Sequence, residues 1–245
     1  MNTEPQAAIL SAKSVNKHFG ALVVLDRVDF SVATDQAVGI VGPNGAGKTT
    51  LLNVLIGSLT PSSGAVEFHG EDVTQLDAAE RCRLGIARSH QVPRPFSGMT
   101  VFENLFVAAA HGGGFARKEA YDRCIGSLEL CGMLPVANRR AETLGLLDRK
   151  RLELARALVT DPVVLLLDEI GGGLTDAEAS ELVDTIKVLR QQKMTIVWIE
   201  HIVHVLLQVA GRLICMDAGR IIADGDPQQV MSDRAVVEAY LGGVD

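Results

Sequence analysis

The stretch Gly42-Pro43-Asn44-Gly45-Ala46-Gly47-Lys48-Thr49 decides the fold of this chain. It matches the pattern G-x-x-x-x-G-K-[ST], a glycine-rich loop whose backbone N–H groups surround a chain of phosphates. Gly45 and Gly47 give the backbone the conformational freedom that such a loop needs. Lys48 can reach the β- and γ-phosphates, and the Thr49 hydroxyl can hold Mg²⁺. We therefore expect a nucleotide site made of Gly42, Pro43, Asn44, Gly45, Ala46, Gly47, Lys48, Thr49 and Thr50.

The residues on either side of the loop support this interpretation. Residues 37–41 are a short apolar run that predicts a buried strand, and residues 50–56 predict a helix. The positive N-terminal end of that helix would face the phosphates. An ordinary glycine-rich turn is the alternative, but it does not account for a strand before the loop and a helix after it. The sequence thus predicts binding of a nucleoside triphosphate.

The composition is typical of a globular protein. A length of 245 residues and a hydrophobic share of 47% allow one large domain or two small ones, and the absence of a repeat favours one domain over residues 1–245. The longest apolar runs, residues 163–167 and 202–209, are shorter than the ~18 residues that a membrane span needs. Residues 1–5 lack the features of a secretory signal, so we expect a cytoplasmic protein.

The net charge bears on the kind of partner, and the cysteine spacing bears on the redox compartment. A formal net charge of −7 argues against nucleic acid, because phosphate contacts need clustered basic residues. The one compact basic cluster, residues 149–151, is explained more simply as a solvated helix face. The cysteines form no C-x-x-C pair, which fits a reducing compartment better than a disulfide or zinc framework; they are Cys82, Cys124, Cys131 and Cys215.

Hydrophobic patterning predicts two kinds of sheet. Residues 8–32 alternate apolar and polar side chains and predict two strands, and residues 65–70 predict a third, which together favour an antiparallel sheet. Unbroken apolar strands alternating with helices then predict a parallel sheet covered on both faces. Its strands are expected at residues 37–41, 85–88, 163–167 and 195–199, with a helix at 176–190 and a closing hairpin at 213–217 and 220–223.

The pattern changes to helices between the second and third of these parallel strands. Glycine and proline residues separate three segments with helical spacing, at residues 101–110, 117–131 and 148–158. The sequence therefore predicts a helical insert within the nucleotide core.

Polar residues follow two of the predicted parallel strands, at the edge where ligands bind. Asp168 can hold Mg²⁺ through water, and Glu169 can orient or deprotonate an attacking water. His201 follows the next strand and can hydrogen-bond a γ-phosphate. The alternatives are a plain loop carboxylate and a surface or core histidine. His204 lies three residues after His201, but no third metal ligand is evident.

In this order, the phosphate loop, the helical insert, the strand ending in Asp168-Glu169 and the strand-end His201 resemble the ATP-binding subunits of ABC transporters over nearly the whole chain. The resemblance implies an α/β P-loop NTPase fold with an antiparallel β-subdomain and an inserted α-helical subdomain. It places the nucleotide core at about residues 1–90 and 159–245, and the helical subdomain at about 91–158. It also implies that Phe19 stacks on adenine, that Gln91 contacts Mg²⁺ and the permease, and that His201 is the switch histidine. A plain core position is the alternative for Phe19.

Three stretches, residues 85–91, 99–105 and 239–242, are most similar to the ATPases of branched-chain amino acid importers, although lipopolysaccharide-export ATPases share the last one. This similarity implies an ATPase subunit at the inner face of the membrane that hydrolyses ATP. Its partners would be a second ABC ATPase subunit, identical or different, separate membrane permeases and an external solute-binding protein. The permeases would engage residues 91–105. A soluble ABC ATPase without a transport role and a weak regulatory subunit remain as alternatives.

The chain departs from the family at its signature, Leu-Ser-Gly-Gly-Gln. The matching segment is Leu144-Gly145-Leu146-Leu147-Asp148, which lacks the serine hydroxyl and places a bulky Leu147 where glycine allows close approach. Asp148 is either a helix N-cap or a repulsive charge near phosphate. Thr175 also replaces an aspartate that the family often has. We expect an asymmetric dimer in which the composite site completed by this signature is weak.

Overall fold

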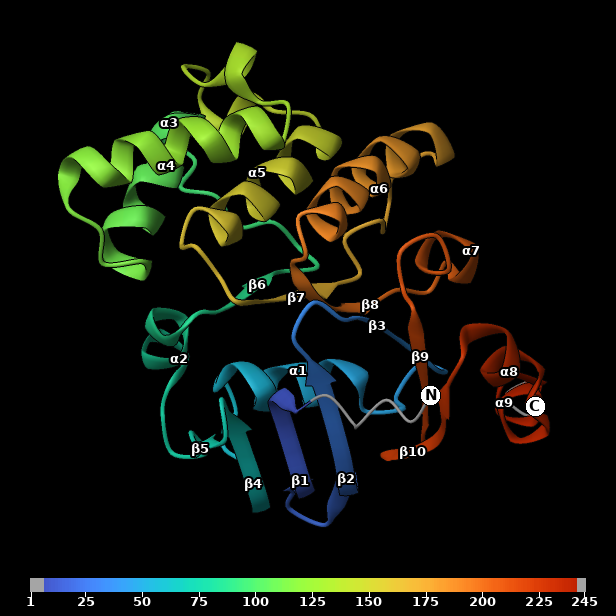
Figure 1. Cartoon of the computed structure of the whole chain (residues 1–245). Helices are drawn as coiled ribbons and strands as arrows, with labels where there is room; N and C mark the ends of the chain where they lie inside the picture. The colour runs from blue at the N-terminus through green and yellow to red at the C-terminus, as the bar shows by residue number, and fades with distance from the viewer. Residues whose placement is uncertain (1–6, 242–245) are drawn as a thin grey trace.

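The computed structural model describes residues 7–241, so Met1 to Pro5 and Gly242 of the sequence patterns lie outside the described residues. The described chain forms two sheets with helices around them (Figure 1). The smaller sheet is antiparallel and has the strand order β2-β1-β4-β5. The antiparallel sheet that the alternating segments predict is thus confirmed. Its strands are β1 (Ala8–Phe19), β2 (Leu22–Ala33), β4 (Ser63–Phe68) and β5 (Glu71–Asp72).

The larger sheet has the order β10-β9-β3-β8-β7-β6. Its strands are parallel from β9 to β6, and β10 runs antiparallel to β9 as a closing hairpin. Every residue of β3, β7 and β8 is buried, as expected for unbroken apolar runs in a sheet covered on both faces. The strands are β3 (Ala37–Val41), β6 (Ile86–Ser89), β7 (Val164–Asp168), β8 (Thr195–Ile199), β9 (Arg212–Asp217) and β10 (Arg220–Gly225).

Helix α1 (Lys48–Ile56) lies between the two sheets (Figure 1). Leu51, Leu52 and Leu55 of this helix belong to one buried cluster with apolar residues of both sheets. A second buried cluster lies on the other face of the parallel sheet, under α5 (Leu146–Leu158), α6 (Asp176–Gln191) and α7 (Val203–Leu206). Helix α1, which follows the phosphate loop, is thus held by burial against both sheets in the first cluster.

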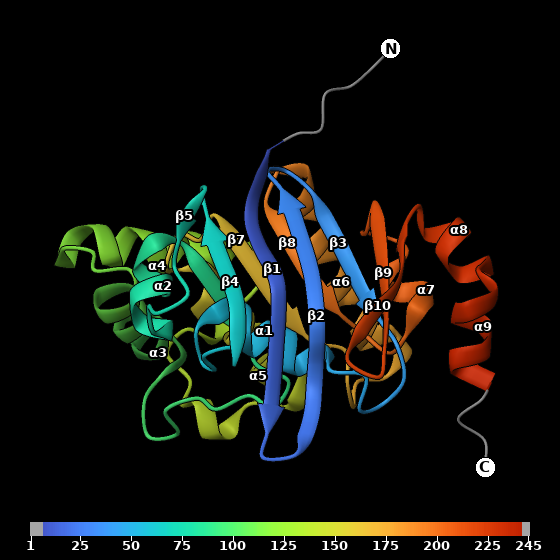
Figure 2. The same ribbon diagram turned by 90° about the horizontal axis from the view of Figure 1, so that it is seen from below.

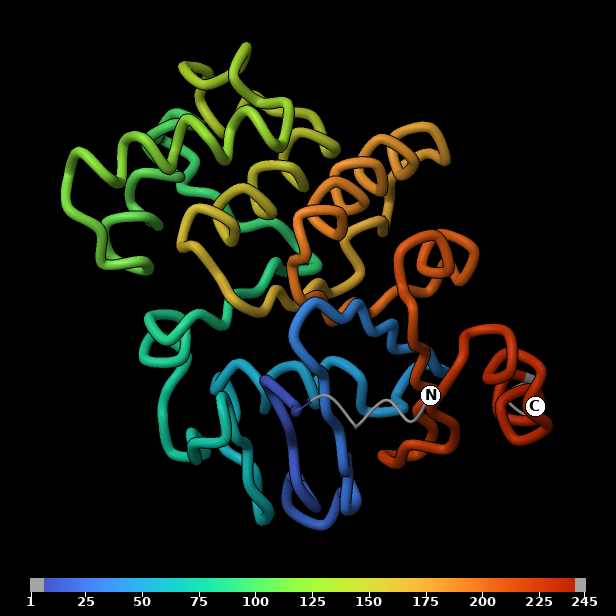
Figure 3. The backbone as a smooth tube through the Cα atoms, viewed as in Figure 1, coloured from blue at the N-terminus to red at the C-terminus, as the bar shows by residue number. Residues whose placement is uncertain are grey.

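The helical insert packs as a group beyond β6 and β7, and the backbone trace in Figure 3 shows the chain leaving the sheet after β6 and returning at β7. It contains α3 (Val101–Val107), α4 (Arg117–Leu130) and α5, with short 3₁₀ helices at Leu134–Val136 and Ala141–Thr143. The boundaries differ from the sequence expectation, and α4 ends at Leu130 instead of residue 131. The first helix continues as a π-helix over Ala108–Gly112, and α5 begins at Leu146 instead of residue 148.

The interpretation of residues 149–151 as a solvated helix face was wrong for Lys150, which is buried. Its neighbours make surface contacts, so the cluster is divided between core and surface because the helix turns about 100° per residue. The remaining helices are α2 (Ala78–Leu84), α8 (Pro227–Ser232) and α9 (Arg234–Leu241), and the view in Figure 2 places α8 and α9 at the edge beyond β9 and β10. Within residues 7–241, no helix has the length and hydrophobicity to cross a membrane.

Candidate nucleotide-binding and hydrolysis site

The sheet topology brings the polar strand ends together. Strands β3, β8 and β7 are neighbours, and Asp168 is paired with Ile199 in the ladder between β7 and β8. Because the carboxyl ends of parallel strands meet at one edge, the phosphate loop, Glu169 and His201 leave the sheet side by side.

The phosphate loop surrounds a cavity of about 190 Å³ that residues 44–50 line together with Val24 and Glu169. Gly45 and Gly47 have positive φ angles of 82° and 99°. A Cβ at Gly47 would also lie 2.7 Å from the Val24 carbonyl oxygen, so only glycine fits there. The loop backbone thus follows the β2 strand closely and leaves its N–H groups room for a ligand.

Lys48 is buried, and its ammonium donates hydrogen bonds to the carbonyl oxygens of Gly42 at 2.7 Å and Pro43 at 2.9 Å. Burial lowers the pKa of Lys48, and the nearby carboxylate of Glu169 opposes this shift. A buried ammonium is stabilised further by an incoming anion, because burial disfavours the uncompensated charge. The loop is therefore suited to a phosphate chain.

Asp168 is buried at the end of β7 and makes two contacts. Its Oδ1 atom lies 3.5 Å from the Thr49 hydroxyl, and its Oδ2 atom lies 2.5 Å from the Arg88 guanidinium. Arg88 also donates to the Asn53 side chain on α1. The sequence interpretation missed this role of Arg88, although an arginine within the buried strand β6 was a signal that a buried carboxylate lies nearby.

Glu169 follows β7, and its carboxylate contacts side chains that follow the two neighbouring strands β6 and β8. Its Oε1 atom lies 2.7 Å from Nε2 of His201, and its Oε2 atom accepts a hydrogen bond from the Gln91 amide. The Glu169 backbone has a φ of 47°, a region that costs a non-glycine residue free energy. The carboxylate is thus held in place by groups that follow β6 and β8.

Lys150 and Glu200, which the sequence interpretation did not assign to the site, hold its loops. The buried Lys150 ammonium donates to the carbonyl oxygens of Gln91 at 2.6 Å and Glu169 at 3.3 Å. The buried Glu200 carboxylate accepts the N–H groups of Gly171 at 3.1 Å and His201 at 3.0 Å. Burial lowers the pKa of Lys150 and raises the pKa of Glu200. These contacts join segments far apart in the sequence, so no local sequence pattern predicts them.

Comparisons with known proteins identify the family to which this arrangement belongs. The family model described as "ABC transporter" matches residues 25–171, and the model described as "Branched-chain amino acid ATP-binding cassette transporter" matches residues 220–245. The chain is 36% identical to the high-affinity branched-chain amino acid transport ATP-binding protein LivG of Escherichia coli K12, over 96% of this chain and 98% of that protein. The corresponding protein BraF of Pseudomonas aeruginosa is 34% identical over 96% and 98% of the two chains. The chain belongs to the ABC transporter ATP-binding family.

Solved structures of the family confirm the fold. A nucleotide-free ATP-binding cassette from an ABC transporter superimposes with a TM-score of 0.87 at 31% identity, over 96% of this chain and 99% of that one. The ADP conformation of the cassette MJ1267 gives a TM-score of 0.85 at 31% identity, over 97% and 100% of the two chains. The present cassette is thus a nucleotide-binding ATPase with the P-loop fold, the antiparallel β-subdomain and the helical insert that the sequence predicts.

The oxygen atoms beside the phosphate loop fit Mg²⁺. This hard cation prefers oxygen ligands and keeps several waters when it binds with phosphates. The Thr49 hydroxyl and the Asp168 carboxylate lie next to each other at the loop, as such a site requires. Gln91, the third residue assigned to the metal, donates a hydrogen bond to the Glu169 carboxylate.

Phe19 of the cassette lies at the end of β1, where the hairpin turns into β2, and its side chain is 50% exposed. The core position that was the alternative for this residue was therefore wrong. The Lys17 ammonium lies 5.1 Å from the centre of the ring. Val24, not Phe19, lines the loop cavity, so stacking of Phe19 on adenine stays a prediction.

The signature segment of the cassette forms the first turn of α5. Gly145 is the N-cap residue and offers no side-chain hydrogen bond, so the interpretation of Asp148 as the N-cap was wrong. Asp148 instead lies in the first turn, 3.7 Å from the Arg151 guanidinium, and Leu147 packs against the buried cluster of the helical insert. The start of α5 thus presents the exposed Leu146 where the family has glycine, and the carboxylate of Asp148 where the family has glutamine.

Proposed function

We propose that this cassette is one of two ATPase subunits of a branched-chain or hydrophobic amino acid importer and works at the inner face of the membrane. Its LivG and BraF relatives support the substrate class, since their names specify branched-chain amino acid transport. The match of residues 220–245 to the branched-chain model supports the same class. The observation that carries the mechanism is the convergence of Gln91 and His201 on Glu169 beside the phosphate loop.

In the proposed mechanism the phosphates of ATP lie in the loop of residues 42–50, and the Lys48 ammonium binds the β- and γ-phosphates. The Thr49 hydroxyl and the Asp168 carboxylate would hold Mg²⁺, which would supply positive charge beside the phosphates. Glu169 orients a water and takes its proton as the water oxygen attacks the γ-phosphorus. The bond to the β-phosphate oxygen breaks, and ADP and phosphate leave. His201 contacts the γ-phosphate through Nε2.

Gln91 and His201 occupy the carboxylate of Glu169, the group that activates water in the proposed mechanism. Both of its carboxylate oxygens face protein groups, Gln91 on one side and His201 on the other. A water can be activated only when one of these contacts opens. Because Gln91 begins the connection from β6 to the helical insert, movement of the insert releases Glu169. Hydrolysis is thereby coupled to the position of the insert.

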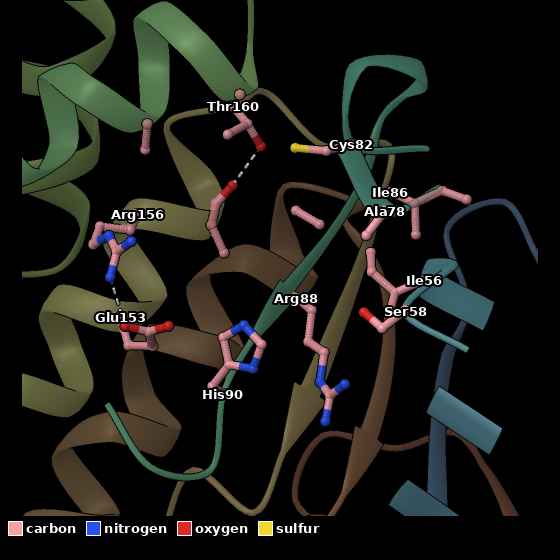
Figure 4. Close-up of a pocket in the computed structure, with 14 residues that line it drawn as sticks. Ile56, Ser58, Ala78, Cys82, Ile86, Arg88, His90, Glu153, Arg156 and Thr160 are labelled. Carbon is pink, nitrogen blue, oxygen red and sulfur yellow. Dashed lines mark hydrogen bonds and ion pairs between the residues drawn. The ribbon is translucent and has the colours of Figure 1, made fainter. Parts of the chain in front are cut away.

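A cavity of about 250 Å³ lies between the nucleotide core and the helical insert, and it offers a docking place for the permease (Figure 4). Ser58 and Cys82 line it from the core, and Arg156 lines it from α5. Arg88 of β6 lines it as well, and so does His90, which follows β6 and directly precedes Gln91. A permease segment seated there would contact His90, the residue before Gln91, and its movement would be transmitted through Gln91 to Glu169. This region extends the expected permease contact at residues 91–105 toward β6.

Cys82 provides a test of this docking place. It is the one cysteine of the described residues that is not buried; Cys124, Cys131 and Cys215 are. A thiol cross-linker of short span is expected to join Cys82 to the permease in membranes and to lose the product in a Cys82→Ser variant. Co-purification of the cassette without any membrane protein, and without a cross-link, would instead favour the soluble non-transport ATPase.

The start of α5 favours a partner subunit that differs from this chain. In the proposed dimer this segment closes over the nucleotide of the partner, where Leu147 and Asp148 are poor substitutes for glycine and glutamine. A homodimer would carry this defect in both sites, whereas a heterodimer with a complete signature in the partner would retain one good site. A homodimer that hydrolyses ATP at a rate equal to the heterodimer would refute the asymmetry. Nucleotide binding without turnover in any complex would favour a regulatory subunit.

A further inference from the structure

The C-terminal helix α9 makes a contact with the phosphate loop that the mechanism above does not use. The N–H of Gly42, the first residue of the loop, donates a hydrogen bond of 2.9 Å to the hydroxyl oxygen of Tyr240. The two residues are 198 positions apart in the sequence. Figure 2 places α9 at the outer edge of the molecule beyond β10, so this side chain links the edge of the fold to its nucleotide site. Tyr240 lies within the 239–242 stretch that resembles the branched-chain importers.

Gly42 is a position where no side chain fits, because the backbone lies against β9. A Cβ on this residue would lie 2.0 Å from the carbonyl oxygen of Met216 on β9. Its φ of 144° also belongs to the region that favours glycine. The loop therefore begins in close contact with β9, and its N–H points to Tyr240.

The carbonyl group of Gly42 makes the contact that matters for nucleotide binding, since it accepts a hydrogen bond from the Lys48 ammonium at 2.7 Å. Gly42 is thus held through its N–H by Tyr240 and holds Lys48 through its oxygen. Two hydrogen bonds connect the tyrosine hydroxyl to the ammonium that binds phosphate in the proposed function.

Helix α9 is anchored well enough to hold the tyrosine in place. Val236 of α9 and Val230 of α8 are buried in the same cluster as residues of the parallel sheet. The ring of Tyr240 is partly exposed, but its hydroxyl reaches the partly buried N–H of Gly42. Burial raises the pKa of Tyr240, so its hydroxyl is neutral at physiological pH.

We infer that Tyr240 is a positioning residue for nucleotide binding: its hydroxyl fixes Gly42, so that the phosphate loop keeps the conformation in which Lys48 and the loop N–H groups receive ATP. The inference rests on the proposed nucleotide site at residues 42–50. Without the hydroxyl, the loop samples other conformations, and binding of ATP must order it first. A neutral hydrogen bond contributes enough to change affinity by about 2- to 10-fold.

The test compares Tyr240→Phe, which removes only the hydroxyl, with Tyr121→Phe, which removes the hydroxyl of the other tyrosine, exposed on α4. Binding of a fluorescent ATP analogue to the full chain and the melting temperature of the ligand-free chain are measured for both. We expect Tyr240→Phe to bind the analogue about 2- to 10-fold more weakly while the ligand-free melting temperature changes little. Tyr121→Phe is expected to bind as the wild type does.

In the assembled transporter, Tyr240→Phe is expected to raise KM for ATP and to leave kcat near the wild-type value, because Tyr240 does not touch the reacting atoms. A lower melting temperature with unchanged affinity would show a purely structural contact and overturn the inference. Lys48→Ala separates the two proposals. If Lys48→Ala abolishes binding of the ATP analogue and Tyr240→Phe binds it with wild-type affinity, the positioning role is wrong. If Lys48→Ala binds nucleotide as the wild type does, the proposed nucleotide site itself is wrong.

Discussion

At the residue scale, Arg88 and Asp168 face each other across β6 and β7 with both side chains almost completely buried. Removing one member of a buried ion pair leaves the other charge without compensation, which typically costs about 3–5 kcal/mol. We expect Arg88→Met to lower the free energy of unfolding, measured in urea, by this amount. The control is Lys187→Met, which breaks the exposed pair with Asp184 and is expected to cost about 0–1 kcal/mol. Similar losses in the two variants would contradict the role of burial.

A second prediction at the residue scale concerns pH. Burial raises the pKa of Glu200 above its usual value of 4.5; Glu169 adds to the rise, and the N–H groups of Gly171, His201 and Ile202 oppose it. Lys150 is the cation near this carboxyl. Because the folded state binds this proton more tightly, Glu200 contributes stability that is present below pH 4.5 and is lost as pH rises through the folded pKa.

Glu200→Gln removes this titration. We expect the wild type to have a higher free energy of unfolding than the variant. This difference is expected to be largest at about pH 4 and to shrink as pH rises. Urea denaturation at several pH values measures it, and Glu119→Gln on the surface of α4 is the control. A difference that grows with pH would show that the shift has the opposite direction.

At the element scale, Thr175 fixes the start of α6 although the family often has aspartate there. Its hydroxyl accepts the N–H of Glu178, and the Glu178 carboxylate accepts the N–H of Thr175, which forms a capping box. We expect Thr175→Ala to destabilise the cassette by about 1 kcal/mol in thermal or urea unfolding. Thr175→Ser retains the hydroxyl and is expected to lose much less. Equal losses would mean that the methyl group, not the cap, matters.

The elements were predictable where their residues carry a periodic signal. The unbroken apolar runs of β3, β7 and β8 and the alternation in β1 and β2 are local properties, so the sequence indicates them directly. The π-helix at Ala108–Gly112 and the early start of α5 depend on packing between helices, which local patterns do not contain. The contacts of the site were missed for the same reason. The hydrogen-bond partners of Arg88, Lys150 and Tyr240 lie 80, 59 and 198 positions away in the sequence. Their roles therefore become visible only in the folded chain.

At the scale of the whole molecule, the proposed heterodimer makes the two catalytic carboxylates unequal. The site formed by this phosphate loop is completed by the partner signature, whereas the partner's site is completed by Leu147 and Asp148. We therefore expect the assembled transporter to keep most of its steady-state ATPase rate when the partner's catalytic glutamate is replaced by glutamine. Substitution of Glu169 is expected to remove it. Equal loss from the two substitutions would show that both composite sites work alike.

The most direct test of the account measures ATP binding and hydrolysis by the Glu169→Gln transporter. Glutamine keeps the size of the side chain but cannot take a proton from water, and general-base catalysis typically contributes about 10²–10⁴-fold. We expect kcat to fall by about this factor while the affinity for ATP stays at the wild-type value. A variant that hydrolyses ATP at the wild-type rate would contradict the central claim that Glu169, held between Gln91 and His201, activates the water.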